Sequence, residues 1–244
     1  MDFKITRIYE TDSTNTYLKN MARAGAPFGS AVIAERQHAG HGRMGRSFSS
    51  ERGGLYMSIL LRLTDPESIG LLTTYAAVAV ARAIESLVPL DVKIKWVNDL
   101  YVGKKKLCGI LAEGGTTYGG ESFVVLGIGV NLDNKLPDEL LMIATSIKEL
   151  CGQAVSPEAL ENRILKEFEN IDRCALGAHI DEYRHRCMML GNKIDVIPHQ
   201  GEKYEAVAID VAHNGALLVR RLSDNKELQL FCGEVSTKIG EAVT

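Results

Sequence analysis

A glycine- and arginine-rich segment, residues 37–48 with the sequence QHAGHGRMGRSF, carries groups suited to binding an anion. It contains the pattern GxGxxG, but the residues that follow are polar and then become a strand, whereas a dinucleotide-binding fingerprint requires a helix to begin at the glycines. The sequence also lacks the GxxxxGK[ST] pattern of a phosphate-binding P-loop. Glycines let backbone N–H groups approach an anion, and Arg43 and Arg46 can donate paired hydrogen bonds to phosphate. The segment predicts a phosphate-binding loop, although a mobile surface loop with solvated arginines would explain the same residues.

A second group of polar residues lies in the segment 95–113. Asn98 and Asp99 stand where a strand meets a turn, which suits either an Asx turn or the binding of a ribose or a metal ion. Lys106 begins an apolar strand and is predicted to point inward, toward the anionic partner that a buried lysine requires. Lys104 and Lys105 are interpreted as solvated residues of a hairpin.

Two glycines, Gly127 and Gly129, interrupt the apolar strand VVLGIGVN and project to the same face of it. Strand glycines weaken a sheet and often mark the close approach of a ligand or of another backbone. The sequence therefore predicts either a ligand site or close helix packing at this face.

The elements that must position these residues follow from apolar periodicity. Several N-cap candidates in TDSTN, residues 11–15, precede a short helix, and the glycine-rich segment is a long loop between two strands. The order of the elements predicts an α+β fold. The pattern predicts helices at residues 16–23, 71–88, 156–175 and 180–189, and strands at residues 30–35, 55–63, 92–97, 106–113 and 122–131.

The character of the sequence changes at Gly191, where a second domain is predicted to begin. Short strands separated by turns of Gly, Asn and Asp are expected at residues 193–198, 204–211, 215–221 and 227–231. We therefore expect a domain of residues 1–190 and a small β-barrel of residues 191–244.

Composition limits the class of protein. The chain has 244 residues, of which 45% are hydrophobic, so it can bury a sizeable core. A net charge of −3 gives no overall attraction for nucleic acid. The sequence has no secretory signal and no apolar run of the ~18 residues that span a membrane, which predicts a cytoplasmic protein. An odd number of cysteines without a CxxC pair predicts reduced thiols at Cys108, Cys151, Cys174, Cys187 and Cys232.

Taken together, these segments resemble the biotin protein ligases, in order and over almost the whole chain. The matching motifs are DSTN at residues 12–15, QxAGxGRxGR at 37–46, KWxND at 95–99, KxxGILxE at 106–113, GIGVN at 127–131 and GEVS at 233–236.

The resemblance implies a catalytic domain related to class II synthetases and biotin/lipoate ligases, with a mixed β-sheet, packed helices and a small C-terminal SH3-like β-barrel. It implies the activation of biotin by ATP and Mg²⁺ to biotinyl-5′-AMP, followed by transfer to a lysine of a biotin carboxyl carrier protein. The chain begins about ten residues before Asp12, which is too short for a helix-turn-helix, so we expect the monofunctional type without direct DNA or membrane binding. Family analogy also makes a homodimer plausible.

By the same resemblance, most candidate site residues fall into two sets. Biotin is expected to bind to Ser13, Thr14, Asn15, Gln37, Gly40, His41, Gly42, Gly109, Ile110, Gly127 and Gly129. ATP and the adenylate are expected to bind to Arg43, Arg46, Phe48, Asn98, Asp99, Lys106 and Asn131. Lys106 and Arg43 are the expected catalytic residues, and Asp99 is the expected metal ligand.

The chain departs from the family pattern at three positions. His41 stands where Arg is common, Met44 where a further basic residue is frequent, and Val97 where Pro is usual, so the loop carries less charge. Phe48 replaces a common Trp and keeps an aromatic face that could stack on adenine.

Two other functions remain open at this point. One is a lipoate protein ligase, a related enzyme that also forms an acyl-adenylate. The other is a biotin-sensing regulator of transcription, which would have to contact DNA through a separate protein.

Overall fold

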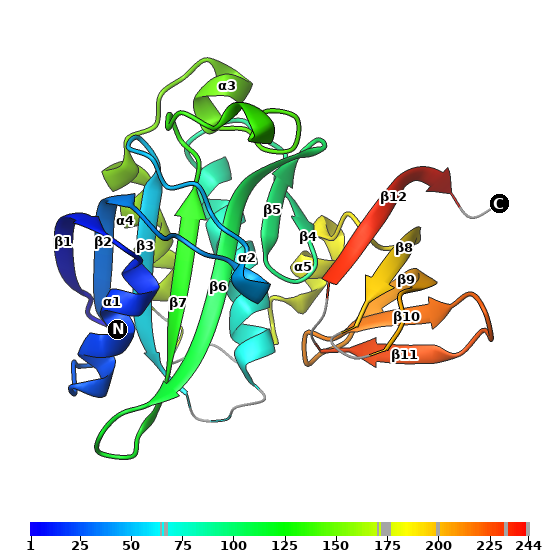
Figure 1. The fold of residues 1–244 in the computed structure, drawn as a ribbon, viewed down its shortest axis with the longest axis horizontal. Coiled ribbons are helices and arrows are strands. Elements are labelled where there is room, and N and C mark those ends of the chain that lie inside the picture. Colours follow the sequence, from blue (N-terminus) through cyan, green and yellow to red (C-terminus); the bar gives the residue numbers. More distant parts are fainter. Residues whose placement is uncertain are drawn as a thin grey trace.

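The computed structural model describes residues 1–63, 65, 68–169, 171, 177–198, 201–231 and 234–242. Its larger sheet has seven strands in the order β1-β2-β3-β7-β6-β5-β4 (Figure 1). The β1–β2 pair is parallel and the other neighbouring pairs are antiparallel, so the sheet is mixed, as predicted. The strands are β1 (Lys4–Thr11), β2 (Ser30–Gln37), β3 (Leu55–Arg62), β4 (Lys93–Lys95), β5 (Asp99–Val102), β6 (Lys105–Thr116) and β7 (Ser122–Val130).

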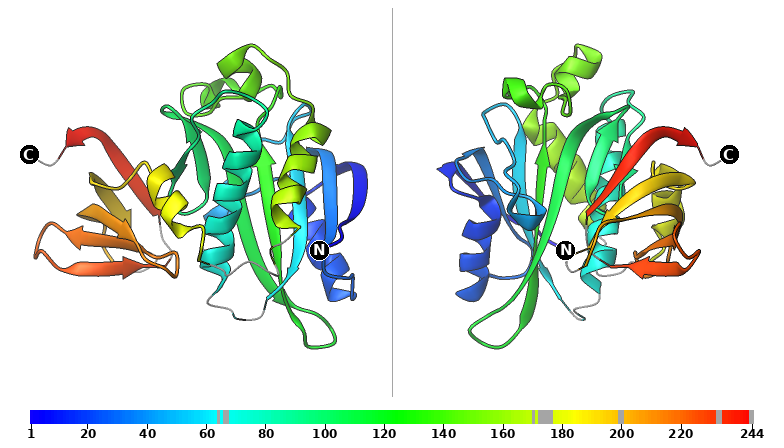
Figure 2. Two further views of the ribbon diagram at one scale, coloured as in Figure 1. Left: turned by 180° about the vertical axis from the view of Figure 1, so that it is seen from behind. Right: turned by 45° about the vertical axis from the view of Figure 1, so that its right-hand side comes forward.

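Helices cover both faces of this sheet (Figure 2). α1 (Thr14–Arg23) packs on one face against β2, β3 and β7. α2 (Ile69–Glu85) and α4 (Pro157–Phe168) pack against each other on the opposite face. Shorter helical segments are η1 (Arg43–Gly45), η3 (Asp138–Leu140), α3 (Ile147–Cys151) and α5 (Ile180–Arg186).

The period of two along each strand sorts the core into two layers. On the α1 face, Leu18 of the helix packs against Val32, Leu60 and Phe123. The strand residues that alternate with Val32, Leu60 and Phe123 face α2 and join the larger core. Ser58 lies two positions before Leu60, so it too faces α1, although it is polar and fully buried.

The C-terminal segment forms a separate antiparallel sheet of five strands, in the order β11-β10-β9-β8-β12. In the described residues, β11 and β12 are its two edges and do not pair with each other, so the small β-barrel that the sequence predicts is not confirmed. Within the described part of the chain, β12 pairs with β8 and with no other strand. The strands are β8 (Asn192–Ile197), β9 (Tyr204–Val211), β10 (Leu217–Arg221), β11 (Glu227–Leu230) and β12 (Glu234–Ala242).

Side chains join the two sheets. The indole Nε1 of Trp96 donates to the carbonyl oxygen of Gly215 at 3.0 Å, and Nε of Arg184 donates to that of Val211 at 2.8 Å. The larger core runs continuously from α2 to Val196 and Val219 of the C-terminal sheet.

Each predicted helix and strand overlaps an observed element, and most ends differ by a few residues. The helix predicted at residues 156–175 overlaps α4, which ends at Phe168, and residues 170 and 172–175 of that prediction lie outside the described residues. The strands β1, β5 and β12 and the helix α3 were not predicted. In the GEVS motif, Gly233 lies outside the described residues, whereas Val235 pairs with Val196.

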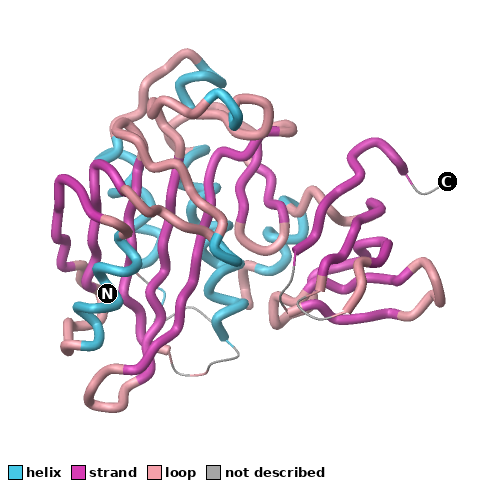
Figure 3. Tube along the Cα trace, viewed as in Figure 1, coloured by secondary structure: helices cyan, strands magenta, loops and turns pink. Residues whose placement is uncertain are grey.

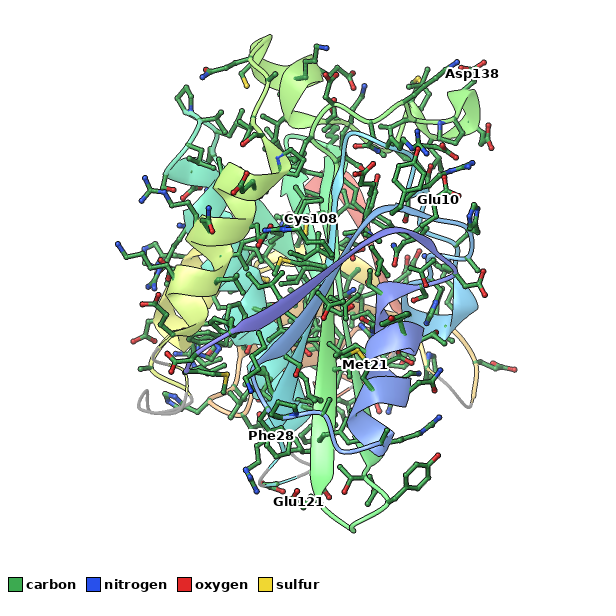
Figure 4. The ribbon with its side chains drawn as sticks, turned by 90° about the vertical axis from the view of Figure 1, so that its left-hand side faces the viewer. Glu10, Met21, Phe28, Cys108, Glu121 and Asp138 are labelled. Carbon is green, nitrogen blue, oxygen red and sulfur yellow. The ribbon has the colours of Figure 1, made fainter. Side chains whose placement is uncertain are left out.

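The structure bears on two expectations from the sequence, reduced cysteine thiols and the absence of a membrane-spanning segment. The thiols of Cys108, Cys151 and Cys187 are free, and Cys108 lies inside the molecule (Figure 4). Cys174 and Cys232 lie outside the described residues. None of the helices in the described part of the chain is long and apolar enough to cross a membrane.

A buried histidine in the contact between α2 and α5 makes stability depend on pH. His179 is 6% exposed, its Nε2 lies 2.8 Å from Oγ1 of Thr74, and its ring meets Tyr75 edge-on. Within the described residues its Nδ1 has no hydrogen-bond partner. Burial, helped by the charge of Arg82, lowers the pKa of His179 from 6.5 to about 4. The folded protein therefore keeps the imidazole neutral in mildly acidic solution.

Between pH 6.5 and pH 4 the unfolded chain binds a proton that the folded chain does not. The free energy of unfolding should therefore fall as the pH falls through this window, by at most about 3 kcal/mol from this residue. Urea unfolding of the wild type and of His179→Gln at pH 7 and pH 4.5 isolates the contribution, because every other group titrates in both. Equal pH dependence in the two proteins would show that His179 is not the cause.

Candidate functional site

A cavity of about 410 Å³ lies on the α1 face of the seven-stranded sheet, beyond the N-terminus of α1. The loop between β2 and β3, which carries η1, crosses in front of β7 and β6 (Figure 3). Of the predicted site residues, only Gly40 is missing from the cavity wall. The wall contains Ser13, Thr14, Asn15, Gln37, His41, Gly42, Arg43, Arg46, Phe48, Asn98, Asp99, Lys106, Gly109, Ile110, Gly127, Gly129 and Asn131.

The cavity lies toward the end of the sheet at which η3 is found. Leu140 of η3 is part of its wall, and Asp138, in the same turn, marks that end of the molecule (Figure 4). Glu121, at the β6–β7 hairpin, lies at the opposite end.

Two glycines form the floor of the cavity because strand pairing places them side by side. Gly109 of β6 pairs with Gly129 of β7, and Gly129 pairs in turn with Tyr56 of β3. A Cβ on Gly129 would lie 2.6 Å from Cε1 of Phe48, and one on Gly109 would lie 3.3 Å from Cε2. The loop therefore lays its aromatic ring on the bare backbone, and the ring meets Tyr56 edge-on at 6.4 Å.

The next row of the sheet supports a polar wall made by the first turn of α1. Ser58, Gly127 and Leu111 are paired neighbours across β3, β7 and β6. A Cβ on Gly127 would lie 2.2 Å from Oδ1 of Asn15, so this glycine makes room for the asparagine. Ser13 caps the helix, with its Oγ accepting from the backbone N–H of Thr16 at 3.5 Å.

Gln37 completes this wall from the end of β2. Its Oε1 accepts from the backbone N–H of Thr14 at 2.8 Å, and Oγ1 of Thr14 lies 3.1 Å from the same oxygen. Its Nε2 donates to Oγ of Ser50 at 2.9 Å. We call the side chains of Thr14, Asn15 and Gln37 the polar wall.

Cationic groups gather at the other end of the cavity. Nζ of Lys106 lies 2.8 Å from Oδ1 of Asp99, so a carboxylate faces this inward-pointing lysine, and it lies 6.0 Å from the centre of the Phe48 ring. Lys105, in contrast, pairs at the surface with Glu149. Nη1 of Arg43 reaches Oδ1 of Asn98 at 3.4 Å. We call Arg43, Arg46 and Lys106 the cationic end.

On the side of its strand opposite to β5, the backbone of Lys106 pairs with the segment at Ala144. Its N–H donates to the carbonyl oxygen of Ile143 at 2.8 Å, and its carbonyl oxygen accepts from the N–H of Thr145 at 2.9 Å. Lys106 is therefore held at its backbone by strand pairing, while its ammonium group reaches the cavity. Tyr101, which pairs with Lys106 from β5, stays protonated, because burial, together with the charge of Asp99, raises its pKa to about 12.

The loop itself is folded into a tight turn. Gly42 donates to the carbonyl oxygen of Arg46 at 2.7 Å, and Met44 adopts the left-handed conformation with φ 55°. Phe48 donates to the carbonyl oxygen of Gly40 at 2.8 Å. A Cβ on Gly40 would lie 2.5 Å from Oγ of Ser50, so Gly40 supports the loop from behind and does not line the cavity.

Asn131, one of the residues predicted to bind the nucleotide, is partly engaged in hydrogen bonds within the protein. Asn131 donates from Nδ2 to the carbonyl oxygen of Thr145 and accepts from Asn134, each at 3.1 Å, so it also holds the segment beyond β7. Among the described residues no group of three or more His, Cys, Asp or Glu side chains could hold a metal ion. Asp99 is the one carboxylate in the described wall of the cavity.

Other parts of the wall were not predicted. Lys95 and Trp96 lie in the KWxND motif, which itself indicates no role for them, and Tyr101 and Leu111 lie beside predicted residues. The segment 136–144 has no motif, and its contact with Lys106 is long-range, so no sequence signal indicates it. It contributes Leu136, Leu140, Ile143 and Ala144, and the C-terminal sheet contributes Ile197 and Val235.

Comparison with known proteins gives consistent matches. The family model "Biotin/lipoate A/B protein ligase family" matches residues 8–133. The biotin--[acetyl-CoA-carboxylase] ligase of Mycobacterium tuberculosis is 32% identical over 86% of this chain and 80% of its own length. The bifunctional ligase/repressor BirA of Bacillus subtilis is 38% identical over 64% of this chain. The chain spans about half the length of that relative, 50%.

Solved structures show the same fold. A biotin protein ligase from Aquifex aeolicus in complex with biotin and ATP superimposes with a TM-score of 0.79. The two chains are 24% identical, and the match covers 96% of this chain and 98% of the other.

Proposed function

Because the chain belongs to the biotin/lipoate A/B protein ligase family, we propose that it activates biotin with ATP and transfers it to a lysine of a biotin carboxyl carrier protein. One observation carries this proposal. A single cavity joins the polar wall, suited to a small ring with hydrogen-bonding groups, to the cationic end, suited to phosphate and carboxylate. The glycine floor and the ring of Phe48 lie between them.

The proposed reaction has two steps. A carboxylate oxygen of biotin attacks the α-phosphorus of ATP, the bond from that phosphorus to pyrophosphate breaks, and biotinyl-5′-AMP forms. The amine of the acceptor lysine then attacks the acyl carbon, an amide forms, AMP leaves and the amine loses a proton. A side-chain nucleophile is not required, because catalysis of this kind consists mainly of positioning and charge stabilisation.

Each end of the cavity has its own task in this scheme. We assign the biotin ring to the polar wall and to Gly109, Ile110, Gly127 and Gly129, with Ser13, His41 and Gly42 at its margin. Lys106 and Arg43 stabilise the charge that develops on the α-phosphate, since preorganised cations in a partly buried site act strongly on it. Arg46, Phe48, Asn98 and Asn131 border the nucleotide.

Asp99 fits a role in holding Mg²⁺ with the nucleotide. Magnesium in such sites is bound by one or two carboxylates together with substrate phosphates, so a larger cluster of acidic residues is not needed. Bound there, Mg²⁺ would neutralise phosphate charge. Asp99 also holds Nζ of Lys106 at 2.8 Å, which keeps that cation at the same end of the cavity.

The polar wall favours biotin over lipoate as the acid. Lipoate carries a dithiolane ring without N–H or C=O groups, so it could not use the acceptor capacity that remains on the Thr14 hydroxyl and the Gln37 carbonyl after their contacts within the protein. A site built to hydrogen-bond a ring discriminates strongly against a ring that lacks those groups. The names of the relatives agree with this choice.

We further propose that the chain consists of two domains, residues 1–190 and 191–244, the second SH3-like. The sheets are formed by strands from separate parts of the sequence, β1 to β7 and β8 to β12, which supports this division. Ile197 and Val235 bring the second domain to the edge of the cavity. The buried thiols of Cys108 and Cys187 suit a reducing compartment, so we place the protein in the cytoplasm.

The release of pyrophosphate tests this proposal. We expect release only when ATP and biotin are both present, and at least about tenfold slower release when lipoate replaces biotin at equal concentration. Faster release with lipoate would identify a lipoate ligase. If well-folded protein releases no pyrophosphate with either biotin or lipoate, activation of both acids is contradicted.

A further inference from the structure

We propose that Glu113 and Ser58, which lie behind the cavity wall, are positioning residues that fix the direction of the hydrogen bonds in the polar wall. In this arrangement Thr14 presents an acceptor oxygen to an N–H group of the bound ring. The inference rests on the proposed function, because the ring is taken to be the cyclic urea of biotin. Neither residue has a role in the scheme above.

The chain of hydrogen bonds begins at the carboxylate of Glu113, on β6. Its Oε1 accepts from Nζ of Lys19 at 2.6 Å, and its Oε2 accepts from Nδ2 of Asn15 at 2.8 Å. Burial raises the pKa of Glu113, but the hydrogen bonds from Lys19 and Asn15, with the charges of Lys19 and His41, outweigh it and lower the pKa. The group is therefore ionised at neutral pH and can only accept hydrogen bonds.

This anion sets the orientation of the Asn15 amide. The NH₂ group of Asn15 lies between Oε2 of Glu113 and the carbonyl oxygen of Leu111, at 2.8 Å and 3.3 Å. Both neighbours lack hydrogen, so only the donor side of the amide can face them. Oδ1 of Asn15 must then face Ser58, whose Oγ lies 2.6 Å away.

The hydroxyl of Ser58 has one proton and two oxygen neighbours. It lies 2.6 Å from Oδ1 of Asn15 and 2.8 Å from Oγ1 of Thr14. Because Oδ1 of Asn15 has no hydrogen, Ser58 must donate to it. The short contact with Thr14 then requires Thr14 to donate to Ser58, since two oxygens at this distance need a proton between them.

The remaining neighbour of Thr14 agrees with this direction. Oε1 of Gln37 already accepts from the backbone N–H of Thr14 at 2.8 Å, and its contact with Oγ1 of Thr14 is longer, 3.1 Å. If Thr14 gave its proton to Gln37, the contact with Ser58 would have none. Oγ1 of Thr14 therefore keeps a lone pair for the ligand, and Gln37 adds a second acceptor oxygen to the wall.

Burial makes this direction consequential. Ser58 is fully buried, and Thr14 and Asn15 are each 4% exposed. Water cannot readily replace a mismatched partner in such a place, so a ring that offers an N–H group binds and a ring without one leaves acceptors unpaired. The polar wall thus selects rings that donate hydrogen bonds.

The test compares two ligands, biotin and a biotin methylated at both ring nitrogens, by calorimetric titration. The wild type should prefer biotin strongly. In Ser58→Ala the affinity for biotin should fall about tenfold, as expected for one buried hydrogen bond, while that for the methylated compound changes less than about twofold. The added methyl groups clash equally in both proteins, so the change in the ratio reports the hydrogen bond alone.

Glu113→Gln should act in the same direction, because an amide can offer either face to Asn15 and no longer fixes it. In the double variant the two effects on the ratio should not add, since both break one chain of bonds. Ser30→Ala is the matched control. It removes another buried hydroxyl, which donates to the carbonyl oxygen of Pro27 at 2.7 Å outside the cavity wall, and should leave the ratio unchanged.

The outcomes separate the inference from the proposed function. No biotin binding by the wild type would refute the proposed function and this inference with it. Biotin binding with an unchanged ligand ratio in Glu113→Gln, or equal losses of both ligands in Ser58→Ala, would overturn the inference alone. If Ser58→Ala does not fold, the ratio in Glu113→Gln still decides.

Discussion

Replacing Lys106 with alanine should lower the rate of biotin adenylation by about 10²–10³-fold while the protein still folds. The ammonium group lies in the cavity wall, 2.8 Å from Asp99. The backbone of Lys106 is held on one side by its pairing with Tyr101 and on the other by hydrogen bonds to Ile143 and Thr145. A preorganised cation facing developing negative charge acts mainly on the transition state, so kcat should fall more than KM rises. Biotin-dependent pyrophosphate release under saturating ATP measures the effect.

Lys105→Ala is the matched control for that variant. Lys105 is the adjacent residue of the same strand, but its ammonium group pairs with Glu149 at the surface. Exposed pairs of this kind contribute little, so turnover and thermal stability should stay near those of the wild type. Near-normal turnover of Lys106→Ala would remove Lys106 from the mechanism.

Replacing Gly129 with valine should weaken the binding of biotin by about 10²-fold or more. The new Cβ would lie 2.6 Å from the ring of Phe48, so the ring must leave the glycine floor and the loop must move with it. A misplacement of about 1 Å can cost about 10²-fold in the rate of a reaction, and we expect a loss of similar size in binding here. Gly127→Val should also weaken binding, because its Cβ would lie 2.2 Å from Oδ1 of Asn15.

Calorimetric titration with biotin, beside thermal unfolding, measures the effect of Gly129→Val. Gly119→Val is the control, since its Cβ would meet only Oγ1 of Thr117, at 3.6 Å. The account expects a large loss of affinity and a small change in Tm for Gly129→Val. A collapse of Tm with affinity retained in the folded fraction would show that this glycine serves packing.

Local signals in the sequence predict much of the architecture. DSTN predicts a capped helix, and Ser13 does cap α1. Apolar strand patterns predict β2, β3, β6 and β7, which carry most of the cavity floor. The edge strand β1 was missed because its residues are mostly exposed or half-buried and give weak alternation.

The glycines show what residue type alone leaves undecided. In the sequence, Gly127 and Gly129 indicate either a ligand or close packing. In the structure, each admits a different side chain of the site, Asn15 or Phe48. That distinction depends on strand register and on a loop about 80 residues earlier in the chain, which no local pattern encodes.

Contacts between distant residues were the least predictable part of the site. Glu113 belongs to a motif, yet its partner Lys19 lies 94 residues away. The segment 136–144 reaches the cavity through its pairing with Lys106, without any motif of its own. Side-chain pairing across a sheet leaves no periodic signal, so such contacts appear only in the folded chain.

The transfer of biotin to an acceptor protein tests the central claim most directly. The chain is incubated with biotin, ATP, Mg²⁺ and a purified biotin carboxyl carrier domain, and intact-mass and peptide mass spectrometry follow the acceptor. The account predicts the addition of one biotinyl group to a single lysine, dependent on ATP and accompanied by release of pyrophosphate and AMP. An acceptor of unchanged mass, with well-folded protein that binds biotin, would contradict it.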